Sequence, residues 1–330
     1  MIVIGGGAAV LQWLGPPPPL PHKPASQPAS IATQSPAAAP ALPLGPIPPQ
    51  PSRPIAPPNP ALLEPSPENP KAMLPRIGPT GLTSMVAYAG SFNQSDPRPR
   101  IGLVIAGLGL SAEESRTAIE SLPGAVSLAF SPYAPDPTDL LKLARSKGHE
   151  ILISLPLEPE GFPLNDAGDE SLLVGASPET NLRHLDWALS RIQGYVGATG
   201  AMDGLYGERF AAASDLLAIL QRRLAARGLL YIDPRPGKPD PALVSGRTVD
   251  IVVDQPPIDP TIKANLQKLE VIARAHRSAL GVIGWPGPRT IELVTDWVES
   301  LPEAGFVLAP VTVLVRHPAP STPPVASATP

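Results

Sequence analysis

The stretch RIGLVIAGLGLSAEE, residues 100–114, decides the fold of this chain. Residues 101–105 form a continuous apolar run with the length of one buried strand. A glycine-rich turn follows, and Ser111 with Glu114 makes the capping-box pattern that begins a helix. A buried strand joined by a short turn to a capped helix predicts the first unit of a fold in which parallel strands alternate with helices.

Seven further apolar runs repeat this arrangement downstream. Helix signals stand between them, such as Ser177 before Pro178 and Gly148 before the third run. Apolar strands that alternate with helices predict an α/β fold with a parallel sheet, and eight repeats in about 215 residues favour a single deformed (β/α) barrel. Functional residues are then expected at the carboxyl ends of the strands. The eight predicted strands are residues 101–105, 126–130, 150–155, 195–199, 229–232, 250–253, 280–283 and 306–309.

The composition changes upstream of residue 100. Of the 49 prolines, 25 lie between Pro16 and Pro99, and proline supports neither a helix interior nor a sheet ladder. Residues 15–99 are therefore predicted to form a disordered proline-rich linker, and residues 317–330 a disordered tail. The folded domain is predicted to span residues 100–316.

The first fourteen residues are mostly apolar. Gly5-Gly6-Gly7 resembles a dinucleotide-binding turn, but that motif needs a helix directly after the glycines, and prolines follow instead. We interpret residues 1–14 as the end of a signal peptide or membrane anchor that starts further upstream, because a full span takes about 20 residues. The expected location is the periplasm, with attachment to the inner membrane through this segment as an option.

Composition argues against several classes of function. The formal net charge is −4 without a basic cluster, so nucleic acid is not an expected partner. The chain has no cysteine and therefore no thiolate site. Its five histidines are His22 and His317 near the ends, and His149, His184 and His276 away from the carboxyl ends of strands. We expect no imidazole-based metal site and no cofactor.

Six short segments carry a family resemblance. They are IAGLG at 105–109, LAFSPYA at 128–134, GHEILISLPLEP at 148–159, GERF at 207–210, LYID at 230–233 and GWP at 284–286. Together, in this order, they resemble the divergent polysaccharide deacetylase family, distant relatives of the NodB-type barrel deacetylases. The resemblance covers almost all of residues 100–316. It implies a NodB-like barrel, an envelope location and polysaccharide as the ligand class.

The resemblance also implies a metal site whose ligands this chain lacks. Family members with an intact site use an Asp-Asp pair and histidines to bind a divalent metal, which activates water while an Asp acts as base. The Asp pair is replaced here by Ala106 and Gly107. Ser154 and Trp285 stand where two of the histidines would be, and no histidine lies just before Arg209. We therefore expect no metal-dependent deacetylation.

Polar side chains that follow strands are the remaining candidates for the mouth of the barrel. Carboxylates can act as general acid and base, and aromatic rings can stack on sugars. Each also has a structural interpretation, because an Asp before a turn bonds its own backbone and an arginine can bridge two loops. The catalytic candidates are Glu158, Asp233 and Asp254, and the substrate-binding candidates are Arg209, Asp203, Tyr206, Trp285 and Ser154.

Three functions remain open. The leading hypothesis is an envelope pseudoenzyme that binds cell-envelope polysaccharide or oligosaccharide without metal-dependent deacetylation. The first alternative is an active carbohydrate hydrolase or deacetylase that uses the carboxylates or an atypical metal site with oxygen ligands. The second alternative is a structural envelope scaffold that binds a protein partner.

Overall fold

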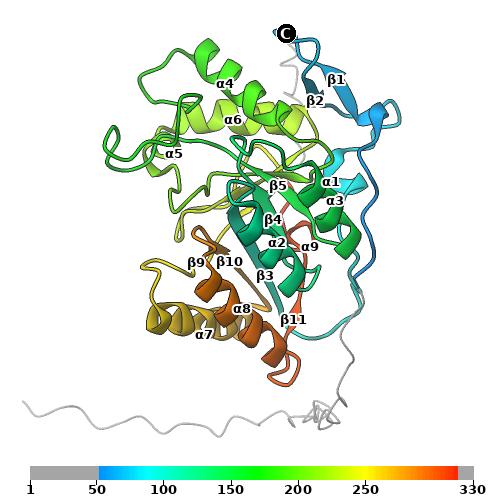
Figure 1. The fold of residues 1–330 in the computed structure, drawn as a ribbon, viewed down its shortest axis with the longest axis vertical. Helices are drawn as coiled ribbons and strands as arrows, with labels where there is room; N and C mark the ends of the chain where they lie inside the picture. The colour runs from blue at the N-terminus through cyan, green and yellow to red at the C-terminus, as the bar shows by residue number, and fades with distance from the viewer. Residues whose placement is uncertain (1–51, 319–330) are drawn as a thin grey trace, which may run out of the picture. The chain divides into compact units, whose positions relative to one another are not determined.

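The structure is a computed structural model that describes residues 52–318. A parallel sheet of nine strands lies at its centre (Figure 1). Its strands are β3 (Arg100–Leu108), β4 (Ser127–Phe130), β5 (Ile151–Ser154), β6 (Gly197–Thr199), β7 (Leu230–Asp233), β8 (Gly246–Thr248), β9 (Ile251–Val252), β10 (Ser278–Ile283) and β11 (Val307–Leu308). They follow the order β8-β7-β6-β5-β4-β3-β10-β9, and β11 pairs with the start of β3.

The sheet curls until its two edges lie side by side. The edge strands β8 and β9 are joined by only Val249 and Asp250, a connection that spans at most about 10 Å. Arg247 of β8 crosses this gap and donates to the hydroxyl of Ser278 at the start of β10, at 2.9 Å. The edges meet without pairing as strands, so the sheet is a deformed barrel. The predicted α/β barrel is confirmed.

All eight strands predicted from apolar runs are present. The search for apolar runs did not predict β8, because Gly246-Arg247-Thr248 contains no such run. Ser111 caps the helix after β3 as predicted, since its hydroxyl accepts from the amide of Glu114 at 3.3 Å. Local pattern therefore located most of the sheet, and only the polar edge strand β8 was missed.

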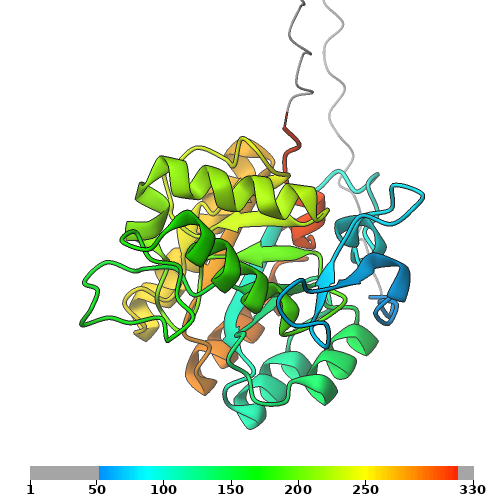
Figure 2. The ribbon, with the colours of Figure 1, turned by 90° about the horizontal axis from the view of Figure 1, so that it is seen from above.

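Helices cover the outer face of the sheet (Figures 1 and 2). Side chains alternate along each strand between the core under these helices and a second core inside the barrel, as Ile153 and Leu152 of β5 illustrate. No helix in the described range is long and apolar enough to cross a membrane. The outer helices are α2 (Ala112–Ser121), α3 (Thr138–Lys147), α4 (Pro178–Ser190), α5 (Glu208–Ala212), α6 (Ser214–Ala226), α7 (Asp259–His276) and α8 (Pro288–Ser300), and α9 (Val311–Leu314) follows β11.

Residues 52–99 are folded, which corrects the predicted domain boundary. They contain the 3-10 helix η1 (Pro60–Leu62), the strand pair β1 (Leu63–Pro65) and β2 (Met73–Pro75), and helix α1 (Ser84–Ala87). Apolar side chains between the prolines supply the reason, since Leu62 and Tyr88 are buried in the inner core. The predictions for residues 1–14, for the linker up to residue 51 and for the tail from residue 319 lie outside the described residues.

The buried carboxylate of Glu150 attaches this N-terminal segment to the barrel. It accepts hydrogen bonds from the amide of Gly90 at 2.8 Å and from the amide of Thr312, in α9, at 3.2 Å. The hydroxyls of Ser127 and Thr312 also donate to it. Burial raises the pKa of Glu150, and the surrounding donors oppose that shift. One side chain thus joins β4, α9 and the N-terminal segment.

Candidate functional site

The mouth of the barrel, at the carboxyl ends of the strands, is lined by small side chains and filled by larger ones. Ala106, Ser154 and Thr199 contribute small buried side chains at this level. Tyr206 and Met202, from the segment that follows β6, are each only 4% exposed. Tyr206 belongs to the inner core, and the sulfur of Met202 lies 3.9 Å from the hydroxyl of Ser131, after β4. The mouth is therefore occupied by the protein's own side chains.

Tyr206 is held in place by Asp254, the second residue after β9. Its hydroxyl donates to the Asp254 carboxylate, and burial raises the pKa of Tyr206, so that the phenol stays a donor. The same carboxylate accepts from the amides of Gly284 at 3.1 Å and Trp285 at 2.6 Å. Burial raises the pKa of Asp254 and its hydrogen bonds lower it. With three donors, this catalytic candidate connects β9 to the end of β10.

Asp203 is presented on a tight turn between Met202 and Leu205. The two flanking residues exchange backbone hydrogen bonds of 2.9 and 2.8 Å. The central residues have φ angles of 48° at Asp203 and 75° at Gly204, the signs of a type I′ turn. Asp-Gly is a favoured pair for this turn, because both positions need positive φ. The amide of Gly204 also donates to the carbonyl of Gly284 at 3.0 Å, which fixes the turn to the end of β10.

The carboxylate of Asp203 lies directly over Gly107. The end of β3 is irregular here, and Gly107 has a φ of 75°. A Cβ added to Gly107 would lie 2.7 Å from Oδ1 of Asp203, so the aspartate fills the space of any side chain at that position. Within residues 52–318, Asp203 has no hydrogen-bond or ion-pair partner for its carboxylate. Burial raises the pKa of Asp203 to about 6.

Trp285 lies beside Asp203 on the outside of the mouth. It is 60% exposed, and its ring lies over the turn, 3.2 Å from where a Cβ of Gly204 would be. A cavity of about 340 Å³ opens on the turn and is lined by Tyr133, Asp166, Ala167, Gly168, Asp169, Met202, Asp203 and Leu205. We call Asp203, Trp285 and this cavity the rim site.

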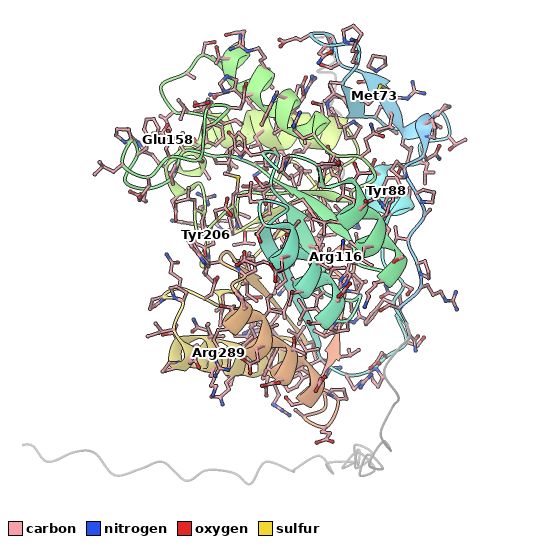
Figure 3. All side chains as sticks on the ribbon, in the orientation of Figure 1. Met73, Tyr88, Arg116, Glu158, Tyr206 and Arg289 are labelled. Atoms are coloured by element: carbon pink, nitrogen blue, oxygen red, sulfur yellow. The ribbon has the colours of Figure 1, made fainter. Side chains whose placement is uncertain are left out.

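Glu158 and Arg209 form an ion pair away from the rim site. Their N–O distance is 2.9 Å, and the buried Glu158 carboxylate also accepts from the amide of Val174. In Figure 3, Glu158 lies among the loops beside α5, whereas Tyr206 lies closer to β9 and β10. This pair joins the loop after β5 to helix α5, as the structural interpretation of both residues predicts.

Asp233 and Ser154 also stand apart from the rim site. Asp233 is buried and forms two hydrogen bonds of 2.8 and 2.6 Å with the guanidinium of Arg235. Asp233 lies two residues after Tyr231 in β7, so both side chains are on the same face of the sheet, toward the outer core. Ser154 is fully buried, and its hydroxyl has no partner within the described part of the chain. Of the predicted residues, the structure brings together Asp203, Tyr206, Asp254 and Trp285.

The residues at the mouth do not fit a divalent metal. In the described range, no three His, Cys, Asp or Glu side chains converge as metal ligands. The buried His149 lies at the amino end of β5, where its ring nitrogens contact the carbonyls of Val126 at 2.8 Å and Ile119 at 3.1 Å. Tyr206 and Met202 are both buried at the mouth.

Asp203 was predicted from the sequence as a site residue, but the turn that presents it was not. A signal was available, because an Asp-Gly pair between two apolar residues is a strong short-range indicator of a type I′ turn. Met202 was missed altogether, since nothing local distinguishes a methionine that fills a barrel mouth from one in an ordinary core.

Comparison with known proteins gives a family match, one similar protein sequence and two similar solved structures. The family model described as divergent polysaccharide deacetylase matches residues 103–315. An uncharacterized protein of Haemophilus influenzae is 27% identical over 221 residues, which cover 64% of this chain and 74% of that protein. The crystal structure of an uncharacterized protein of Agrobacterium tumefaciens has 29% identity and a TM-score of 0.68, and the match covers 74% of this chain and all of that one. The catalytic domain of a peptidoglycan N-acetylglucosamine deacetylase from Eubacterium rectale has 13% identity and a TM-score of 0.42, over 70% of this chain and 96% of that one.

Proposed function

This chain belongs to the divergent polysaccharide deacetylase family, and we propose that it binds a cell-envelope polysaccharide at the rim site without metal-dependent deacetylation. One observation carries the proposal. The mouth is filled by Tyr206, whereas Trp285 is exposed beside it and the half-buried carboxylate of Asp203 has no partner within residues 52–318. A filled mouth beside an exposed aromatic ring and a free acceptor is suited to binding a chain across the rim.

The chemistry of the rim site suits a sugar. The indole of Trp285 has a flat apolar face that is exposed to solvent. A pyranose ring that stacks on this face would remove its apolar surface from water. An ionised carboxylate accepts strong hydrogen bonds from hydroxyl groups. The cavity of about 340 Å³ next to the turn lies at the lower end of the range of about 300–1,000 Å³ for ligand sites. The family name supports polysaccharide as the ligand class and nothing finer.

The hydrolase alternative has less support from the geometry. Glycosidases commonly need two carboxylates that face one bond. Glu158 and Asp233 are each paired with an arginine, and Asp254 already accepts from three donors. Asp203 is the one candidate carboxylate of the described chain that is left without a donor, and its pKa of about 6 suits a general base. Assays for released acetate and reducing ends on wild type and Asp203→Asn test this alternative.

We also keep the periplasm as the proposed location, with the N-terminal segment as a candidate anchor. The support is the apolar sequence of residues 1–14 and the proline-rich sequence that follows. Fractionation of cells that express the full-length chain from its genomic start tests this proposal.

Binding of the full chain to purified peptidoglycan and to soluble envelope polysaccharides tests the main proposal. Trp285→Ala is expected to weaken binding about tenfold, as the loss of one central aromatic contact does. Val271→Ala is the matched control, because it shortens an apolar side chain that is 67% exposed on α7. The proposal fails if no envelope polysaccharide binds, or if Trp285→Ala binds as well as Val271→Ala.

A further inference from the structure

A second cavity lies between the N-terminal segment and helix α3. It has a volume of about 630 Å³ and is bordered by residues 54–58, by one face of α3 and by the residues that follow α4. Pro54, Pro58, Leu141 and Ile192 give it apolar walls. We call it the arm groove. It shares no lining residue with the cavity of the rim site.

Among the described residues, three cationic side chains and no acidic side chain line the arm groove. They are Lys142 and Arg145, one turn apart on α3, and Arg191 after α4. Lys142 pairs with Asp139 at 3.0 Å, outside the groove lining. Arg191 donates to a backbone carbonyl at 3.0 Å and stacks over Trp187 at 5.4 Å, so it has no acidic partner within residues 52–318.

Arg145 is the unusual member of this group. It is only 7% exposed and forms no ion pair within the described part of the chain. Its Nη2 donates to the carbonyls of Gln193 and Gly194, the latter at 3.2 Å, while its buried Nε has no hydrogen-bond partner. Pro58 and Gly194 enclose the guanidinium. Burial lowers the pKa of Arg145, as expected for a cation removed from water without a counter-charge.

A buried charge without an opposite charge is unfavourable, and an anion in the groove would offset it. We propose that the arm groove binds an oxyanion, a phosphate or a carboxylate, attached to an apolar body. The oxyanion lies among Lys142, Arg145 and Arg191, and the apolar body lies against the proline and aliphatic walls. Arginine forks match the geometry of both oxyanions, and the volume is that of a small-molecule site.

Isothermal titration calorimetry of the full chain with hexyl phosphate, hexanoate and inorganic phosphate tests the proposal. We expect hexyl phosphate or hexanoate to bind at one site per chain, at least tenfold more tightly than inorganic phosphate, because only the first two carry an apolar body. The comparison of hexyl phosphate with hexanoate identifies the preferred oxyanion. Equal affinity for inorganic and hexyl phosphate would overturn the apolar part of the proposal.

Variants locate the site. The double variant Lys142→Ala/Arg191→Ala is expected to weaken binding about tenfold or more, since it removes two charged donors at exposed positions. Arg222→Ala/Lys263→Ala, at exposed positions on α6 and α7, is the matched control and is expected to bind as wild type does. Arg145→Ala is expected to abolish binding, and if it does not fold, the double variant decides. The proposal is overturned if none of the three probes binds at millimolar concentration, or if both double variants bind alike.

Discussion

Lowering the pH through 6 is expected to release polysaccharide from the rim site, because the acceptor is the carboxylate of Asp203. Burial raises the pKa of Asp203 from 3.8 to about 6. The carboxylate is thus ionised and able to accept two or more hydrogen bonds above pH 6, and protonated below it. Binding that needs the ionised form is present above the folded-state pKa and is lost as the pH falls through it.

The size of the effect follows from the population of the ionised form. At pH 7.5 the carboxylate is almost fully ionised, and at pH 5 only about one molecule in eleven is, so the affinity falls about tenfold between them. Asp203→Asn keeps the shape but replaces a charged acceptor by a neutral one. A hydrogen bond to a charged group contributes about 1 kcal/mol more free energy than a hydrogen bond between neutral groups. The variant is therefore expected to bind about fivefold more weakly at pH 7.5.

Titration calorimetry at pH 5, 6, 7 and 7.5 measures this dependence on whichever envelope oligosaccharide binds. Trp285→Ala serves as the comparison, because it lowers the affinity at every pH while leaving the slope in place. Asp203→Asn is expected to show a flat profile over the same range. A wild-type profile without a slope near pH 6, or an unchanged slope in Asp203→Asn, refutes the role of Asp203.

Three further predictions concern stability, measured by urea unfolding. Gly107→Ala is expected to destabilise the fold by about 1–3 kcal/mol, since its φ is positive and its Cβ would meet a carboxylate, whereas Gly175→Ala, with open space around it, is expected to change little. Glu150→Ala leaves two backbone amides without their acceptor and is expected to lower the free energy of unfolding by about 2–5 kcal/mol. A smaller decrease than in Gly107→Ala would contradict this. Tyr206→Phe removes one donor from the buried Asp254, with an expected cost of about 1–2 kcal/mol at pH 7.5 that shrinks as Asp254 becomes protonated in acid.

The sheet was predictable because each buried strand carries its own signal. A parallel strand covered on both faces needs an unbroken apolar run, and such a run can be read without knowledge of its neighbours. β8 lacks one, since an edge strand of three residues with a central arginine is stabilised by contacts to Asp250 and Ser278.

The N-terminal segment was misjudged because proline content was taken as a measure of disorder. Proline prevents regular ladders, but it does not prevent an extended chain from packing on a surface. Leu62, Leu74 and Tyr88 are the side chains that pack, and they are spaced too widely to form a helical or strand pattern. Leu62 and Tyr88 are buried in the inner core and Leu74 in the outer core, and both cores are formed mainly by residues elsewhere in the chain.

The sequence alone determined the barrel and the set of polar residues at the strand ends. Only the tertiary structure decided which of those residues are free. Asp254 is satisfied by residues 30 or more positions away in the chain, and Glu158 by Arg209. Asp203, above Gly107, has no partner among the residues that the structure describes. Residue type sets what a side chain can bind, but the donors that reach it come from distant segments. Local sequence cannot report whether a carboxylate is already occupied.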